Sequence, residues 1–333
     1  LRWSSKADLL KAMAYLTMPA LLGPVFGPPL GGVLVTWLSW HWIFLLNLPI
    51  GLLGIALVLR HVPDYPGQRT RALDLRGFLL GSPALACLVL AFESLGHGSL
   101  RWEWSCLLLL AGVAFAGAYV RHARRAPAPL LDLSLLRIPS FALVLWGGTL
   151  FRLGSASLPF LLVLLFQLGY GMTALEAGLL TFAGGAGALL IKFISVPLAR
   201  RFGFRRLLVW NTLLGALSIA LCALFSAETA PLVVMFMLFL GGLSRSLQMT
   251  AMGALTYADI PPQRSASAAT LSATSVQISL SLAVCLAAML LGLVQRVRGH
   301  GQPEAGDIQL TLVLVSLMCL AAGLVFRRLD RGK

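Results

Sequence analysis

The sequence has few charged residues and very few acids. Asp, Glu, Lys and Arg make up 11% of its 333 residues, and only 12 residues are Asp or Glu. Soluble domains carry about 25% charged residues. With 58% apolar residues and a mean hydropathy of +0.87, the chain is too apolar for a soluble globule or a disordered protein.

Cysteine and histidine are also scarce. The five cysteines form no CxxC pair and lie in apolar runs, so we expect no disulfide framework, no metal site and no cofactor. The five histidines are scattered and show neither HxxxD nor HExxH spacing. This argues against a membrane-embedded lipid-modifying enzyme, which would need clustered catalytic side chains. We keep such an enzyme only as a remote alternative.

Long apolar runs dominate the chain. A membrane helix needs about 20 mostly apolar residues, and ten stretches meet this requirement. The runs are long and do not alternate, which favours helices over strands. We therefore expect an all-α polytopic membrane protein with spans at 12–37, 41–60, 75–95, 104–121, 140–168, 173–199, 206–226, 231–257, 266–295 and 308–326.

The basic residues predict the orientation of these spans. The net charge is +14, from 26 Lys and Arg. With a cytoplasmic N-terminus, 20 of them flank the inner ends, three flank the outer ends and three lie in spans. This positive-inside bias predicts that both termini are cytoplasmic. We attribute the net positive charge to the orientation of the spans and to contact with anionic lipid, and we expect no nucleic-acid partner.

A segment rich in glycine and proline, residues 23–32, lies in the first span. Gly23, Gly27 and Gly31 recur every four residues and share a helix face that permits close packing. The prolines among them remove amide donors and bend the helix. An ordinary kinked helix packed through small residues is the simplest alternative.

This segment resembles the antiporter motif in the fifth helix of drug-exporting members of the major facilitator superfamily. The stretch 40–51, Trp-His-Trp-Ile-Phe-Leu-Leu-Asn-Leu-Pro-Ile-Gly, resembles the sixth-helix signature of the fourteen-helix drug:proton antiporters, the EmrB/QacA-like subfamily. The resemblance implies that the first motif packs between the two lobes, seals the outer side and limits proton leak. The residues that would do so are Gly23, Pro24, Gly27, Pro28, Gly31 and Gly32.

The resemblance also implies a domain organisation. Residues 1–60 would be two helices of an N-terminal lobe whose first four helices are absent, 61–138 an inter-lobe region with two extra spans, and 139–333 a complete six-helix C-terminal lobe. The family's second signature is Asp-Arg-x-Gly-Arg-Arg. Here residues 200–206 have Arg200 at the acidic position, so the charge pairing of that motif is in doubt.

Three basic residues fall inside spans, where charge is costly and often functional. They are Arg152, Lys192 and Arg245. At about 100° per residue, Arg152 shares a face with Ser155, Lys192 with Thr181, and Arg245 with Gln248. Thr274 and Gln277 belong to a polar stripe in 266–295. We expect these faces to line a shared cavity that pairs ions or binds substrate.

Simpler roles remain open for the same residues. Polar stripes also mediate helix packing, and Lys192 could extend to the inner interface. No carboxylate lies at the midplane of the C-terminal lobe. Arg152 and Arg245 therefore either pair with acids in the absent helices or attract an anionic group of the substrate.

The resemblance implies proton-coupled efflux of hydrophobic or amphipathic small molecules by alternating access, in a bacterial inner membrane. The expected partners are the lipid bilayer, a small-molecule substrate and protons, with a periplasmic adaptor protein as a further candidate in the intact system. The alternative is a truncated remnant that does not transport.

Overall fold

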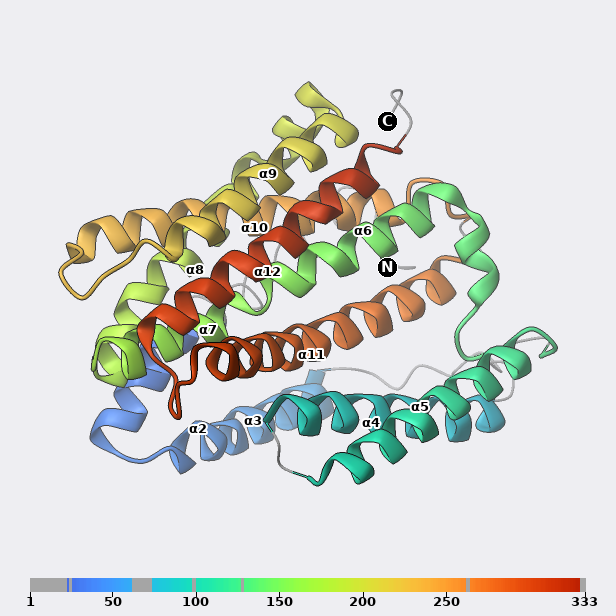
Figure 1. The fold of residues 1–333 in the computed structure, drawn as a ribbon. Coiled ribbons are helices and arrows are strands. Elements are labelled where there is room, and N and C mark those ends of the chain that lie inside the picture. The colour runs from blue at the N-terminus through green and yellow to red at the C-terminus, as the bar shows by residue number, and fades with distance from the viewer. Residues whose placement is uncertain are drawn as a thin grey trace.

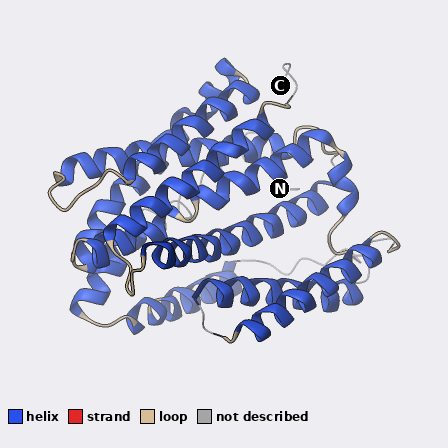
Figure 2. Cartoon of the chain, viewed as in Figure 1, coloured by secondary structure: helices blue, strands red, loops and turns tan. Residues whose placement is uncertain are grey.

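The structure is a computed structural model that describes residues 23, 26–61, 74–97, 100–126, 129–261 and 264–329. Over these residues it consists of helices joined by loops and turns, without strands (Figure 2). Within these ranges, nine segments are long and apolar enough to cross a membrane. They correspond to nine of the ten expected spans. Of the remaining span, 12–37, the structure describes residue 23 and residues 26–37, which are helical. The all-α class is therefore confirmed.

The helices have the following bounds. The first half of the chain contains α2 (His41–Leu45), α3 (Asn47–His61), α4 (Leu75–His97), α5 (Trp102–Ala123), and the short 3-10 helix η1 (Leu133–Arg137). The second half contains α6 (Pro139–Ser155), α7 (Leu158–Leu164), the π-helical turn η2 (Leu165–Gly169), α8 (Ala174–Phe202), α9 (Phe204–Cys222), α10 (Pro231–Thr256), α11 (Ser265–Arg298) and α12 (Ala305–Phe326).

Helices α6 to α12 form one bundle (Figure 1). In it, α10 packs on α8 and α9, α12 packs on α6 and α9, and α11 packs on α6. Its core contains fully buried apolar side chains such as Phe151, Leu161, Leu208, Ile308 and Leu312. The hairpin of α4 and α5 packs on α11 through α4. The bundle is thus the unit that positions the interior side chains.

The outward-facing side chains of these helices are apolar. Phe193, Trp210 and Leu232 are at least two-thirds exposed, and no residue of α2 or α3 is buried. An apolar surface of this extent is unstable in water. It fits a lipid environment or further packing partners.

The expected span 140–168 is interrupted in the structure. The chain turns at residues 156–157, between α6 and α7, and Pro159 lies in the first turn of α7. Proline has no amide hydrogen and its ring clashes with the carbonyl four residues earlier, here that of Ser155. The hydroxyl of Ser157 donates to the Gly154 carbonyl oxygen at 2.7 Å and stabilises the turn.

The helix ends form two groups, on opposite sides of the bundle in Figure 1. The tryptophan end carries Trp40, Trp42, Trp102 and Trp104 together with the start of α8. The arginine end carries Arg60, Arg121, Arg124, Arg137, Arg205, Arg264 and Arg327. The separation of aromatic and basic residues matches that of helices crossing a bilayer.

Candidate functional site: two interior cavities of the helix bundle

The glycine- and proline-rich helix, residues 26–37, contacts α8 near the tryptophan end. A Cβ atom added at Gly178 would lie 2.6 Å from the Pro28 carbonyl oxygen, and one at Gly32 would lie 2.8 Å from the Ala174 carbonyl oxygen. The ring centroids of Phe26 and Phe182 are 6.1 Å apart. The two backbones therefore meet closely because glycine is present on both sides.

The contact uses a different face from the one that the spacing suggested. Around Gly23, Gly27 and Gly31, no described atom lies within 4 Å of an added Cβ. Pro28 and Gly32, one turn apart, make the close approach instead. Pro24 lies outside the described residues. The role of this motif as a seal stays a prediction.

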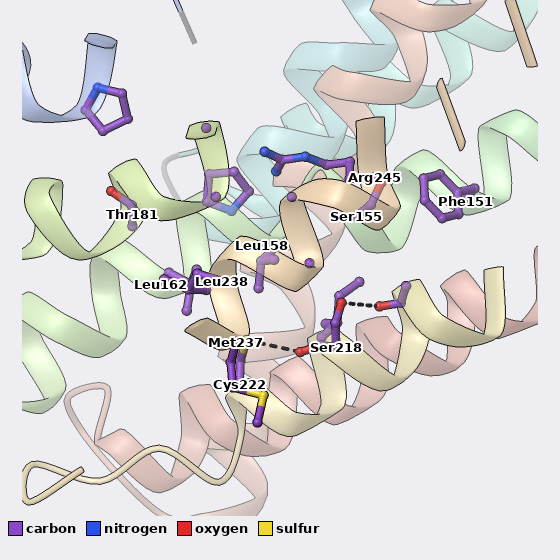
Figure 3. Close-up of a pocket in the computed structure, with 18 residues that line it drawn as sticks. Phe151, Ser155, Leu158, Leu162, Thr181, Ser218, Cys222, Met237, Leu238 and Arg245 are labelled. Atoms are coloured by element: carbon purple, nitrogen blue, oxygen red, sulfur yellow. Dashed lines mark hydrogen bonds between the residues drawn. The ribbon is translucent and has the colours of Figure 1, made fainter. Parts of the chain in front are cut away.

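A cavity of about 240 Å³ opens beside this contact, among α6 to α10. We call it the Arg245 cavity. Figure 3 shows its lining side chains, with Arg245 beside Ser155 and with Thr181 further away, on α8. The walls are largely apolar, and Pro28 adds the glycine- and proline-rich helix to them. The lining consists of Pro28, Phe151, Ser155, Leu158, Pro159, Leu162, Thr181, Gly184, Gly185, Gly215, Ser218, Ile219, Cys222, Met237, Leu238, Gly241, Gly242 and Arg245.

Arg245 is the single charged side chain of this lining. It is half-buried and makes no hydrogen bond or ion pair within the described ranges. The nearby hydroxyl of Ser155 is buried and also has no described partner. An unpaired cation and a free hydroxyl in an apolar wall can hold one polar group of a mainly apolar molecule.

A second cavity, of about 100 Å³, lies among α6, α10 and α11, toward the arginine end. We call it the Arg152 cavity. Arg152 has 6% of its surface exposed, and its Nε has no hydrogen-bond partner in the described part of the chain. Arg152 thus lies next to Phe151 in sequence but faces a different cavity.

Gln248 does not line either cavity. It is fully buried, and its amide joins α10 to α9. Its Oε1 accepts from Asn211 Nδ2 at 2.8 Å, and its Nε2 donates to Thr212 Oγ1 at 2.9 Å. Asn211 and Thr212 were not among the expected site residues, although a polar pair inside an apolar run was a usable signal. The network satisfies the buried amide and holds the two helices together.

Lys192, Thr274 and Gln277 also lie outside the linings of these two cavities. The ammonium of Lys192 donates to Thr250 Oγ1 at 2.7 Å, which links α8 to α10. Thr274 is half-buried and Gln277 is exposed on α11. A direct role of these three residues in substrate binding stays a prediction.

Ser155 and Thr181 do not line a cavity together with the basic residues with which they share a helical face. Ser155 was grouped with Arg152, and Thr181 with Lys192, yet both line the Arg245 cavity. The turn at residues 156–157 ends α6 just beyond Ser155, so a continuous helical wheel does not describe this region.

Hydrogen bonds to Asp74 and an ion pair between Arg264 and Asp132 hold helix ends together at the arginine end. Asp74 accepts from His122 at 2.7 Å and from the amides of Gly77 and Leu130. Burial raises the pKa of Asp74, but these hydrogen bonds outweigh it, so the pKa lies below its ordinary value. Arg264 pairs with Asp132 at 2.6 Å and joins α11 to the segment before α6.

The fold and its interior define a polytopic, all-helical membrane protein with two cavities, each lined by one arginine. The particular family follows from comparison. The chain belongs to the Major Facilitator Superfamily, whose model matches residues 1–152 and 144–333.

Three relatives share the name "Putative multidrug resistance protein MdtD". The protein of Citrobacter koseri is 34% identical, over 97% of this chain and 69% of its own length. Those of Klebsiella pneumoniae and Escherichia coli are 39% and 38% identical, over 85% and 86% of this chain. The chain spans 60% and 61% of the length of these two relatives. Their superfamily and name are those of transporters, not enzymes.

A solved structure described as "Structure of a bacterial metal transporter" aligns with a TM-score of 0.44 and 18% identity, over 94% of this chain and 84% of that chain.

Proposed function

We propose that the chain takes part in proton-coupled efflux of hydrophobic or amphipathic small molecules by alternating access. One observation carries this proposal. The Arg245 cavity has an apolar wall, one unpaired guanidinium, and a wall residue, Pro28, from the glycine- and proline-rich helix. A movement of that helix on α8 would therefore change the access to the cavity. The relatives named for multidrug resistance support the same class of substrate.

The proposed orientation places the arginine end in the cytoplasm and the tryptophan end outside. The contact of Pro28 with Gly178 would then lie on the outer side of the Arg245 cavity, where a seal against leak is needed. The domain organisation proposed is the one given by the motifs, with the C-terminal lobe at 139–333. An adaptor protein in the periplasm would act only in the intact system.

Transport can be tested in everted membrane vesicles that contain the 333-residue chain. An imposed proton gradient should drive accumulation of an amphipathic dye with an anionic group, such as 8-anilino-1-naphthalenesulfonate, and nigericin should abolish it. Arg245→Gln should reduce the initial rate by at least about tenfold, because loss of a charge-assisted contact costs about 1.5–3 kcal/mol. Arg296→Gln, on the exposed end of α11, is the matched control.

Uptake that is unaffected by the gradient would refute proton coupling. No uptake by the chain would favour the alternative, a remnant that does not transport. Equal rates for Arg245→Gln and the parent would remove this cavity from the path.

A further inference from the structure

Arg152 is a buried cation without a counter-ion in the described ranges. Its guanidinium makes no ion pair or hydrogen bond there, and only 6% of the residue is exposed. The two Nη atoms lie 3.0 and 3.1 Å from the position that a Cβ at Gly148 would take. The residue is the fourteenth of α6, so it lies about 20 Å from the start of that helix.

The acids of the bundle lie too far along their helices to neutralise this charge. Within α6 to α12 and the described segments that join them, every carboxylate lies in a loop, at a helix cap or in a first helical turn. These residues are Glu176, Glu228, Asp259, Glu304 and Asp307. A buried ion without a partner destabilises the fold. A bound anion would offset this destabilisation.

The cavity at Arg152 has the composition of a small anion site. Three residues with hydroxyl side chains, Thr256, Ser272 and Ser275, line it together with apolar residues, including Met252. The Thr256 hydroxyl already donates to the Met252 carbonyl oxygen at 2.8 Å, so Ser272 and Ser275 are the hydroxyl residues that remain for an anion. Its volume is about 100 Å³, whereas pockets for drug-sized ligands measure roughly 300–1,000 Å³. It can therefore hold the polar head of a compound, whose apolar part must lie elsewhere.

The Arg245 cavity offers that space. Phe151 lines it and is followed directly by Arg152, and α10 contributes to both cavities within two turns, through Arg245 and Met252. A molecule with one acidic group and an apolar body would first place its acid at Arg152. As the molecule moves toward the Arg245 cavity, the same acid would reach the second guanidinium.

We propose that Arg152 binds the anionic group, a carboxylate, sulfonate or phosphate, of an amphipathic compound. The proposal rests on the function proposed above, because it names the class of substrate. It differs from an ion pair with an acid of the protein, since it requires the site to take up an anion from outside.

Equilibrium binding can test this without any transport. The chain is placed in phosphatidylcholine nanodiscs, whose lipids carry no net charge, and fluorescence polarisation measures the Kd of 1-pyrenebutanoate and of neutral 1-pyrenebutanol. Arg152→Gln should raise the Kd of the anion at least tenfold and change that of the alcohol less than twofold. Arg296→Gln should alter neither.

A second pair of variants tests the site without removing the buried arginine. Ser272→Asp supplies a carboxylate inside the cavity and should raise the Kd of 1-pyrenebutanoate at least tenfold. Ser272→Asn has the same shape without the charge and should leave the Kd within threefold of the parent. Both variants retain Arg152, so their effects do not depend on the folding of an Arg152 variant.

Unchanged binding of the anion in Arg152→Gln and Ser272→Asp, or an equal loss of both probes, would overturn the proposal. Displacement of the probe by equimolar inorganic phosphate would overturn the claim that the ligand is amphipathic, because a small free anion would then bind as well. Binding that depends on Arg152 in a chain that shows no proton-driven uptake would refute the proposed transport and leave the anion site standing.

Discussion

The contact between α8 and α10 allows a quantitative test with a single methyl group. A Cβ added at Gly242 would lie 1.9 Å from the Gly184 carbonyl oxygen and 2.9 Å from the Gly184 Cα. Carbon and oxygen atoms in contact are normally about 3.3–3.6 Å apart, so one helix must retreat by more than about 1 Å. Overpacking of this kind costs about 1–3 kcal/mol. Gly242→Ala should lower the free energy of unfolding by that amount.

Gly253 provides the control on the same helix. Nothing described lies within 4 Å of a Cβ at this position, and alanine in a helix is favoured over glycine by about 0.5–1 kcal/mol. Reversible unfolding in mixed micelles with increasing dodecyl sulfate should therefore separate Gly242→Ala from Gly253→Ala by about 1.5–4 kcal/mol. Equal stability of the two variants would refute backbone contact between α8 and α10.

Two further predictions concern other contacts. Gly178→Leu should push the glycine- and proline-rich helix from α8 and lower cross-linking between cysteines placed at Phe26 and Phe182, whereas Gly27→Leu, with open space around it, should not. Asp132→Asn should lower stability at pH 7 by about 1 kcal/mol. Burial raises the pKa of Asp132, but hydrogen bonds from Ser134 and Arg264 outweigh it and hold the pKa below its ordinary value. The stabilisation is therefore present at neutral pH and lost as the pH falls through the lowered pKa. The parent and Asp132→Asn should then converge in stability, and a constant difference down to pH 2 would contradict this sign.

The spans could be predicted from the sequence because lipid selects for apolar length, which a single chain displays directly. Nine expected spans correspond to helices of the structure, with bounds that differ by a few residues. The break at residues 156–157 was missed. Arg152 and Ser155 had been placed on one continuous helix, but Pro159, which has no amide hydrogen, lies in the first turn of a second segment.

The partner of each face was harder to predict than the face itself. Repeated glycines identify a helix surface that tolerates close approach, but they do not say which neighbour occupies it. Gly23, Gly27 and Gly31 formed the obvious row, yet the described contact with α8 uses Pro28 and Gly32. The choice depends on the neighbouring helix, and here α8 offers Gly178, where the lack of a side chain leaves room for a carbonyl oxygen.

The two interior arginines also show that a residue can be identified from the sequence while its neighbours cannot. Arg152 and Arg245 stood out because a charge in an apolar run is costly, and this needs no knowledge of the fold. Whether they share one cavity depends on where their helices cross. Phe151 and Arg152, adjacent in sequence, point into different cavities, so α6 separates the two spaces with its own side chains. A solute that crosses the bundle between these cavities must therefore pass α6 near Phe151, with one arginine before this point and the other after it.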